Sequence, residues 1–297
     1  MILDKIVQRT SQRVNDQKQI IPLEEIKPLA LALASQPHKP ECIVTTNSQY
    51  TAIGGSECYS HPNPDTCNPL STFPFERALK SLDMSFICEV KKASPSKGII
   101  AHRFPYLDIA KEYENAGANA ISVLTEPDFF LGSDIYLSEI KQQVAIPVLR
   151  KDFIIDEYQI YQSKLIGADA ILLICSLLDT STLSRYIELA DSVGLSCLVE
   201  AHSQEEIESA LAAKARIIGV NNRNLKTFEL DINTSISLRK YVPDNIIFVS
   251  ESGISTLEDI RKLCDINASA VLIGEAFMRS HDISQCLSQL KGALTRN

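Results

Sequence analysis

A carboxylate and an ammonium group stand two residues apart at the end of an apolar run, in Phe86-Ile-Cys-Glu-Val-Lys-Lys-Ala-Ser-Pro-Ser-Lys-Gly98. The run is rich in strand-forming residues and ends in a polar turn. Because side chains alternate between the two faces of a strand, Ile87, Glu89 and Lys91 share one face. Burying charges is costly and even a pair gains little, so this placement indicates acid–base chemistry rather than stabilisation. The alternative interpretation is a structural Glu–Lys pair on a solvated edge strand.

Eight apolar runs follow one another along the chain, separated by polar loops and helical segments. They cover residues 86–92, 120–126, 147–153, 170–176, 196–201, 217–222, 246–252 and 270–276. Apolar strands that alternate with helices indicate a parallel sheet covered on its outer face, and eight such units fit an α/β fold, the (β/α)8 TIM barrel. An open doubly wound sheet is the main alternative, but its usual G-x-G-x-x-G turn after the first strand is missing here.

We expect a single domain over residues 1–297, built in three parts. Residues 1–35 predict an N-terminal extension of two helices, the second of which starts after Pro22. Residues 36–72, rich in Pro, Ser, Thr and Asn, predict an irregular insertion before the first strand. Residues 73–297 predict the barrel, with helices at 106–116, 156–165, 180–193, 204–212 and 256–263.

The strand ends carry candidate catalytic groups, because the active sites of such barrels lie at the C-terminal ends of the strands. Lysine, glutamate and asparagine side chains at these ends suit acid–base chemistry on a substrate with an aromatic part and anionic groups. Any one of them alone would be an ordinary loop charge or helix cap. The candidates are Glu89, Lys91, Lys151, Glu200 and Asn221, with Phe130 and Phe153 beside them.

Two glycines, Gly253 and Gly274, follow the last two predicted strands. Glycine lets backbone N–H groups approach an anion closely, and the N-terminus of a following helix adds further donors. The loops after these strands form the usual phosphate site of the fold. We therefore expect both glycines to admit a phosphate group because they carry no side chain.

The first motif, Glu89-Val-Lys-Lys-Ala-Ser-Pro-Ser-Lys-Gly98, resembles the signature of the indole-3-glycerol phosphate synthase family. The similarity covers the chain from about residue 73 to the end, together with the N-terminal helices. Further matching motifs are Leu124-Thr-Glu-Pro-Asp-Phe-Phe-Leu-Gly-Ser133, Leu149-Arg-Lys-Asp-Phe153, Leu198-Val-Glu200, Gly219-Val-Asn-Asn-Arg-Asn-Leu225, Ser250-Glu-Ser-Gly253 and Leu272-Ile-Gly-Glu-Ala276. The resemblance implies a lyase of tryptophan biosynthesis. It would ring-close 1-(2-carboxyphenylamino)-1-deoxyribulose 5-phosphate with loss of carbon dioxide and water, using no metal and no organic cofactor.

The resemblance also implies catalytic roles for the matching residues. Lys151 would be the general acid that protonates the substrate carbonyl oxygen as the ring carbon attacks it. Glu200 would stabilise the cation that forms and accept a proton. Lys91 would bind the substrate carboxylate, with a second role as acid in the dehydration, and Glu89 and Asn221 would orient these groups.

The implied binding residues form three groups. The phosphate would be held by Ser94, Gly253 and Gly274, with the backbone of Glu275. The apolar wall around the anthranilate ring would consist of Phe130, Phe153, Leu172, Leu225 and Leu272. Further polar contacts would come from Glu251 and from Ser252, which counts among the implied catalytic residues.

The insertion at residues 36–72 departs from the family, in which this link is much shorter and the N-terminal helices lie over the barrel mouth. Its composition predicts a surface excursion that adds little to the core. Cys58-x-x-His61 has a spacing that could suit a metal, but the segment has no paired Cys-x-x-Cys. We therefore expect no metal site there.

The composition is that of an ordinary soluble globular protein, with 45% hydrophobic and 22% charged residues. A net charge of -8 argues against nucleic acid or an anionic membrane as the main partner. The scattered cysteines, together with the lack of a secretory segment or an apolar span, predict a cytoplasmic protein. Its expected partner is a small phosphorylated substrate. We expect a monomer or weak homo-oligomer, and leave association with other tryptophan-pathway enzymes open.

Three alternative functions fit a barrel with these residues. A phosphoribosyl isomerase would bind phosphate similarly, but resembles this chain less at the first strand, where such enzymes use Cys or Asp. A Schiff-base aldolase would use Lys151 as a nucleophile. A barrel that serves only as a binding scaffold would have no reason to keep the full set of strand-end residues.

Overall fold

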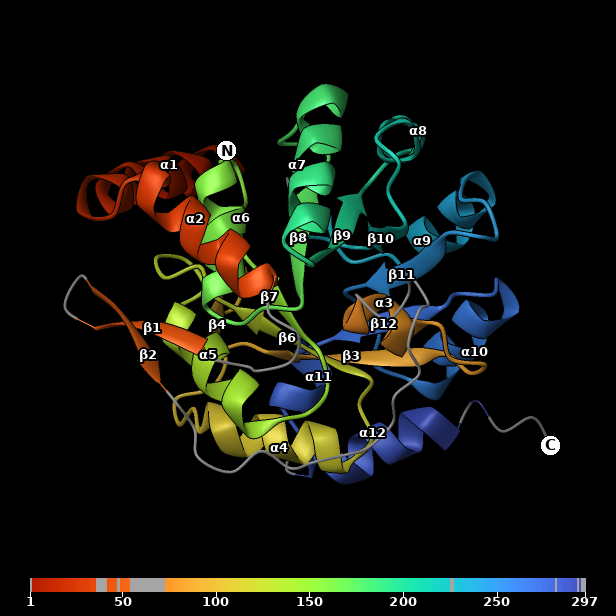
Figure 1. Ribbon diagram of the computed structural model, residues 1–297. Coiled ribbons are helices and arrows are strands. Elements are labelled where there is room, and N and C mark those ends of the chain that lie inside the picture. The colour runs from red at the N-terminus through yellow and green to blue at the C-terminus, as the bar shows by residue number, and fades with distance from the viewer. Residues whose placement is uncertain are drawn as a thin grey trace.

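The computed structural model describes residues 2–35, 42–46, 49–53, 73–224, 227–280, 282–292 and 294. Eight parallel strands close into a barrel in the order β3-β6-β7-β8-β9-β10-β11-β12, and β12 pairs with β3 (Figure 1). They are β3 Ser85–Val90, β6 Ala120–Leu124, β7 Val148–Lys151, β8 Ala170–Ile174, β9 Ser196–Ala201, β10 Ile217–Asn221, β11 Ile247–Glu251 and β12 Ala270–Ile273. The predicted TIM barrel is confirmed. Since β3 is paired on both sides, the interpretation of Glu89 and Lys91 as an edge-strand pair is wrong.

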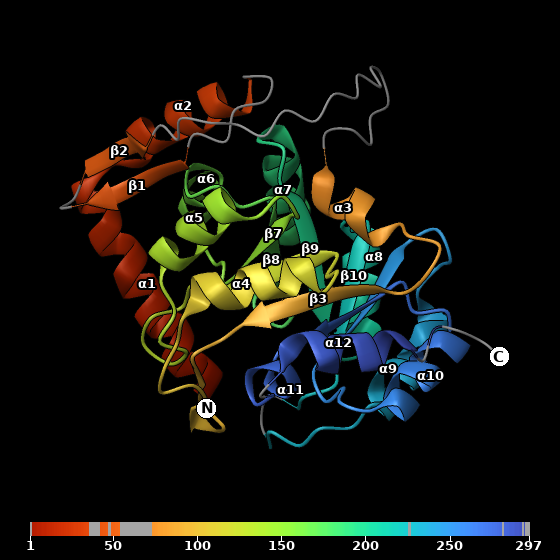
Figure 2. The ribbon, with the colours of Figure 1, turned by 90° about the horizontal axis from the view of Figure 1, so that it is seen from below.

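Helices alternate with the strands and cover the outside of the barrel, as α4 and α12 do beside β3 (Figure 2). They are α4 Tyr106–Asn115, α5 Asp134–Gln143, α6 Glu157–Leu165, α7 Thr180–Ser192, α8 Gln204–Ala212, α9 Asn233–Leu238, α10 Leu257–Asp265, α11 Glu275–Met278 and α12 Ile283–Gly292. The five predicted helices are confirmed to within two residues at each end. Several begin at a side chain that accepts a backbone N–H, as at Asp156 and Thr256.

The apolar core has two layers, separated by the barrel strands. Phe86 and Cys88 of β3 face the outer layer between strands and helices, whereas Ile87 faces the inner layer that fills the barrel. The predicted alternation along this strand is confirmed, and it places Glu89 on the inner side with Ile87. At the other end of β3, Phe75 and Leu79 of helix α3 Pro74–Leu79 also join the inner layer.

The two predicted N-terminal helices are α1 Ile2–Ile20 and α2 Leu23–Ala34, and α2 starts after Pro22 as expected. Helix α2 lies alongside α6 (Figure 1). Its residues Ile26 and Ala30 are buried. In the part of the chain that the structure describes, no helix has the length and apolar character needed to cross a membrane.

The segment before α3 contains an antiparallel hairpin of β1 Cys42–Thr46 and β2 Gln49–Ile53. The prediction of an irregular insertion is therefore wrong for these ten residues. Each strand holds several β-branched or aromatic residues, which favour extended backbone, and the prolines and glycines that motivated the prediction lie outside both strands. Cys58 and His61, the residues of the metal spacing considered above, lie outside the described residues.

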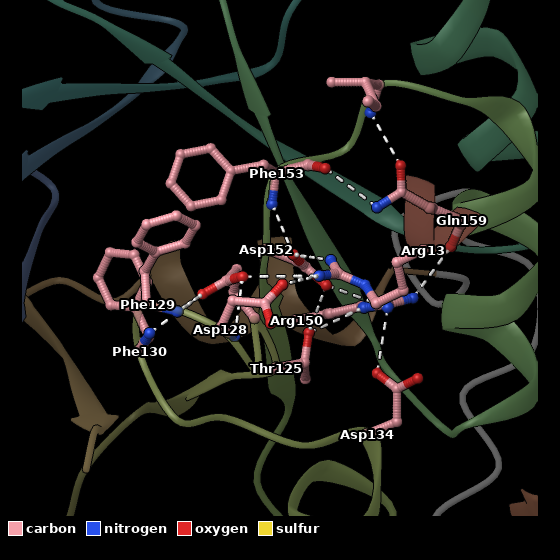
Figure 3. Close-up of polar contacts among 12 residues, drawn as sticks. Arg13, Thr125, Asp128, Phe129, Phe130, Asp134, Arg150, Asp152, Phe153 and Gln159 are labelled. Atoms are coloured by element: carbon pink, nitrogen blue, oxygen red, sulfur yellow. Dashed lines mark hydrogen bonds and ion pairs between the residues drawn. The ribbon is translucent and has the colours of Figure 1, made fainter. Parts of the chain in front are cut away.

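Arg150 of β7 points away from the barrel interior and is almost fully buried, at 2% exposure (Figure 3). Its guanidinium group donates to Asp134 at 3.1 Å and to Asp152 at 3.2 Å. Further donations go to Thr125 and to the backbone carbonyl of Gln159. The network therefore joins the ends of β6 and β7 to the starts of α5 and α6, and it fixes the strand end on which Lys151 stands.

We predict that Arg150→Met lowers the free energy of unfolding by about 3 to 5 kcal/mol, because Asp134 loses its cation and the buried Asp152 is left with Arg13 alone. Denaturation in urea measures the change. Arg261→Met provides the matched control, since Arg261 is exposed and its replacement should cost less than about 0.5 kcal/mol. Equal effects of the two substitutions would contradict the assignment of a structural role to Arg150.

Candidate active site

A cavity of about 410 Å³ opens at the C-terminal ends of the barrel strands. It collects side chains from most strand ends, as the sequence predicted for the site. The predicted residues that line it are Glu89, Lys91, Ser94, Phe130, Lys151, Phe153, Leu172, Glu200, Asn221, Ser252, Gly253, Leu272, Gly274 and Glu275. Glu251 is not among the lining residues, and Leu225 lies outside the described residues.

The ammonium group of Lys151 is the electrostatic centre of the site. Its Nζ lies 3.2 Å from Oε2 of Glu251 and 3.6 Å from Oε2 of Glu200. Burial alone would lower the pKa of Lys151, but the charges of Glu251, Glu200 and Glu89 outweigh burial and raise this pKa above its ordinary value. Lys151 therefore stays positively charged at neutral pH.

A second ammonium group, that of Lys91, forms an ion pair with Glu89. Burial of Glu89 acts to raise the pKa of its carboxyl group, but the charges of Lys91 and Lys151 prevail and lower it. Glu89 is therefore ionised, and the positive charges of both lysines stabilise its carboxylate. The two lysine side chains remain about one-sixth exposed, at 16% and 17%, so both can meet a ligand in the cavity.

Glu251 lies behind Lys151 and is only 1% exposed. Burial, together with the charge of the neighbouring Glu200, raises the pKa of Glu251 to about 7 against the opposing charge of Lys151. Its Oε1 has no hydrogen-bond partner. The site thus holds three carboxyl groups against two ammonium groups, and burial makes Glu251 easier to protonate than an ordinary glutamate.

Two glycines provide the space that the buried carboxylates occupy. A Cβ atom on Gly219 would lie 2.1 Å from Oε1 of Glu251, and one on Gly274 would lie 2.5 Å from Oε1 of Glu89. The expectation that Gly274 lacks a side chain to admit a phosphate therefore has to be corrected, because that space belongs to Glu89. Gly253 has a positive φ of 73°, so its requirement for glycine is conformational.

Three cationic side chains that the sequence analysis did not select lie at the cavity next to Ser94. They are Lys97, Arg223 and Arg279, all of which pair with Glu275. Arg223 also approaches Oγ of Ser96 at 3.5 Å, which connects the loops after β3 and β10. The sequence could have indicated two of these side chains as site residues, since Lys97 and Arg223 both lie inside motifs quoted for the family resemblance.

The aromatic side of the cavity is formed by Phe130 and Phe153, whose ring centroids are 6.0 Å apart. The first turns of α1 line the cavity as well, through Ile2, Leu3 and Ile6. The expectation that the N-terminal extension lies at the barrel mouth is thus confirmed for α1. The apolar pattern of residues 2–20 predicts a helix, but it cannot assign these residues to the site, because their contacts are with residues far along the chain.

Arg13 attaches α1 to the loops that carry both phenylalanines (Figure 3). Its guanidinium group lies 3.2 Å from Asp152 and 3.5 Å from Glu126. Glu126 in turn accepts the backbone N–H groups of Phe129 and Phe130, at 2.7 and 3.0 Å. One ion-pair cluster therefore fixes the covering helix, the aromatic loop and the end of β7 relative to one another.

The fold is that of a (β/α)8-barrel enzyme, with lysine and glutamate side chains gathered at the cavity where the strands end. The sequence profile of the family Indole-3-glycerol phosphate synthase matches residues 63–290. The chain therefore belongs to the indole-3-glycerol phosphate synthase family, whose members are carboxy-lyases of tryptophan biosynthesis.

Similar proteins agree with this assignment. The chain is 65% identical over 223 residues to the indole-3-glycerol phosphate synthase of Ruminiclostridium cellulolyticum, covering 75% of this chain and 86% of that protein. It is 47% identical over 294 residues to the one of Lachnoclostridium phytofermentans, covering 99% and 100%. A solved 3-hexulose-6-phosphate synthase from Salmonella typhimurium shares the fold at 15% identity, with a TM-score of 0.59 over 71% of this chain and 98% of that one.

We predict that Arg13→Met loosens α1 from the barrel mouth, because Asp152 and Glu126 lose the cation that connects them to the helix. Trypsin should then cleave within α1 several times faster, while the urea unfolding of the barrel changes little. Arg9→Met is the matched control, since Arg9 is exposed one turn earlier on the same helix. Unchanged cleavage in Arg13→Met, relative to Arg9→Met, would show that apolar contacts alone hold α1.

Proposed function

We propose that this site closes the pyrrole ring of 1-(2-carboxyphenylamino)-1-deoxyribulose 5-phosphate to give indole-3-glycerol phosphate, with Lys151 as the general acid. The observation that carries the proposal is the Lys151 ammonium group, which stays protonated among three carboxyl groups yet remains partly exposed to the cavity. A carbonyl oxygen that gains negative charge during attack by a ring carbon needs such a proton donor.

The other charged groups suit the remaining steps. Lys91 would leave its pair with Glu89 to bind the substrate carboxylate, and would then serve as acid for the departing hydroxyl group. Glu200, whose Oε2 faces Lys151, would stabilise the cation that forms on the ring nitrogen and accept the proton that restores aromaticity. Glu89 and Asn221 would orient these groups, and Ser252 would add a polar contact.

The phosphate group would lie between the loops after β3, β11 and β12. Ser94, Gly253 and the backbone at Gly274 and Glu275 face the cavity there. Arg223, Lys97 and Arg279 supply positive charge on the same side, although Glu275 offsets part of it. The anthranilate ring would lie against Phe130, Phe153, Leu172 and Leu272, and α1 would cover it.

The proton balance of this reaction is closed by protein side chains and water. The substrate carboxylate leaves as neutral carbon dioxide, the carbonyl oxygen takes up two protons to leave as water, and one proton leaves the ring. Each turnover therefore takes one proton from solvent. Lys151 and Lys91 give the two protons, and Glu200 takes the one that the ring releases.

We further infer that the protein works in the cytoplasm as a monomer or weak homo-oligomer, with association with other enzymes of the pathway left to experiment. The cysteines support the cytoplasmic assignment. Among the described residues, Cys88, Cys175, Cys197 and Cys286 are free thiols, and the first three are buried.

Lys151→Ala should reduce kcat by about 10² to 10⁴-fold, the range typical for loss of a general acid. Indole absorbance measures turnover, and circular dichroism checks that the barrel is folded. Lys111→Ala on the exposed face of α4 is the control and should retain full activity. Normal turnover in folded Lys151→Ala would remove Lys151 from the mechanism, and borohydride trapping of a Lys151 adduct would support the aldolase alternative.

Gly274→Ala should lower kcat rather than only raise KM for the phosphorylated substrate. The added methyl group would lie 2.5 Å from Oε1 of Glu89 and would displace that carboxylate from Lys91. Gly292→Ala is a suitable control, because among the described residues nothing outside its own helix turn and chain neighbours lies within 4 Å of a Cβ built there. A pure increase in KM with unchanged kcat would instead assign the space at Gly274 to the phosphate group.

A further inference from the structure

His202 stands two residues after Glu200, just past the end of β9, in a chain of three ionisable groups. Its Nε2 lies 3.6 Å from Oε1 of Glu200, and its Nδ1 lies 3.4 Å from Oε2 of Glu206 in α8. The same Glu206 oxygen accepts the backbone N–H of His202 at 2.7 Å. The exposed fraction of the side chains rises along this chain, from 4% for Glu200 through 18% for His202 to 25% for Glu206.

The two oxygens of Glu200 face two different cationic groups. Oε2 faces Lys151 at 3.6 Å, and Oε1 faces the ring of His202 at the same distance. Nε2 of His202 is buried and has no hydrogen-bond partner, so Glu200 is the acceptor within its reach. Glu200 lines the cavity and His202 does not, so the ring faces Glu200 from the side away from the cavity.

We propose that His202, as an imidazolium ion bridging Glu200 and Glu206, is a positioning residue for Glu200. Its Nε2–H would fix the rotation of the Glu200 carboxylate, so that Oε2 stays directed at Lys151 and at the substrate. This inference rests on the proposed function for its catalytic consequence, but the contact between the two side chains does not depend on that function.

The groups around His202 favour the charged ring. Glu200, Glu206 and Glu251 approach from β9, α8 and β11, and Lys151 lies beyond Glu200 on β7. Cys175, at the end of β8, donates to the backbone carbonyl of Glu206. Burial alone would lower the pKa of His202, but the hydrogen bond with Glu206 and the charges of Glu200, Glu206 and Glu251 raise it above its ordinary value.

The raised pKa of His202 determines how kcat should depend on pH. With a raised pKa in the folded protein, His202 keeps its proton to a higher pH than a free histidine does. The bridge is complete at pH values below the ordinary histidine pKa, and it is lost as the pH rises through the pKa of the folded protein. The kcat of the wild-type protein should therefore carry a decrease over that interval.

Two substitutions separate the two contacts of the ring. In His202→Asn, the side-chain amide can replace Nδ1 near Glu206 but cannot reach Glu200. In His202→Gln, the longer amide can place a donor near Glu200, but it does not titrate. We expect kcat to fall about 10- to 100-fold in His202→Asn with KM nearly unchanged, as for other groups that misplace a catalytic side chain. His202→Gln should retain more activity and lose the decrease of kcat with pH that His202 causes.

A titration followed by NMR tests the contact without using activity. The chain has five histidines, and the signal that disappears in His202→Asn identifies His202. Glu200→Gln should lower the pKa measured for His202, because it removes the charge on Oε1. An unchanged pKa in Glu200→Gln would overturn the proposal, as would equal activity and equal pH profiles in wild type, His202→Asn and His202→Gln. If wild-type protein formed no indole-3-glycerol phosphate while Glu200→Gln still lowered this pKa, the proposed function would fail and the bridge would stand.

Discussion

The site depends on one buried ammonium group, that of Lys151, shared among Glu89, Glu200 and Glu251. Three carboxylates inside a barrel would repel one another, and each would lose the hydration that it has in water. Lys151 and Lys91 offset most of this repulsion, and burial raises the pKa of Glu251 to about 7, so that this carboxyl group can take up a proton near neutral pH. The barrel backbone is adapted to the cluster, since Gly219 and Gly274 leave room for two of the carboxyl groups.

This cluster also explains why so many polar contacts surround the ends of β6 and β7. Lys151 can interact with three carboxylates only if its strand end is held in place. The ion pair of Arg150, on the outer side of the barrel, with Asp152, at the cavity, holds this strand end. Arg13 extends the same network to α1. Packing on the outside of the barrel, electrostatics inside it and the covering of the cavity are therefore connected through a single strand end.

Much of the fold and part of the site could be predicted from the sequence, because both depend on local pattern. The alternation along β3 assigned Glu89 to the inner face, and strand ends of a barrel share one mouth whatever their separation in sequence. Contacts that depend on depth or on distant partners could not be predicted. The sequence could not show that Glu251 lies behind Lys151, that Gly274 makes room for Glu89, or that Arg13 reaches Asp152, 139 residues later.

The site has one carboxyl group more than it has ammonium groups, and this excess would favour the proposed reaction. The substrate brings a further carboxylate to Lys91, and this charge would compete with Glu89 for the same ammonium group. Carbon dioxide then leaves as a neutral molecule, and its bonding electron pair stays in the ring, where it cancels the positive charge that ring closure placed there. The cation that forms when the hydroxyl group leaves gains attraction from Glu200 and Glu89. The same crowding of negative charge therefore opposes the carboxylate of the bound substrate and favours the cation that decarboxylation and dehydration require, which is the difference on which catalysis depends.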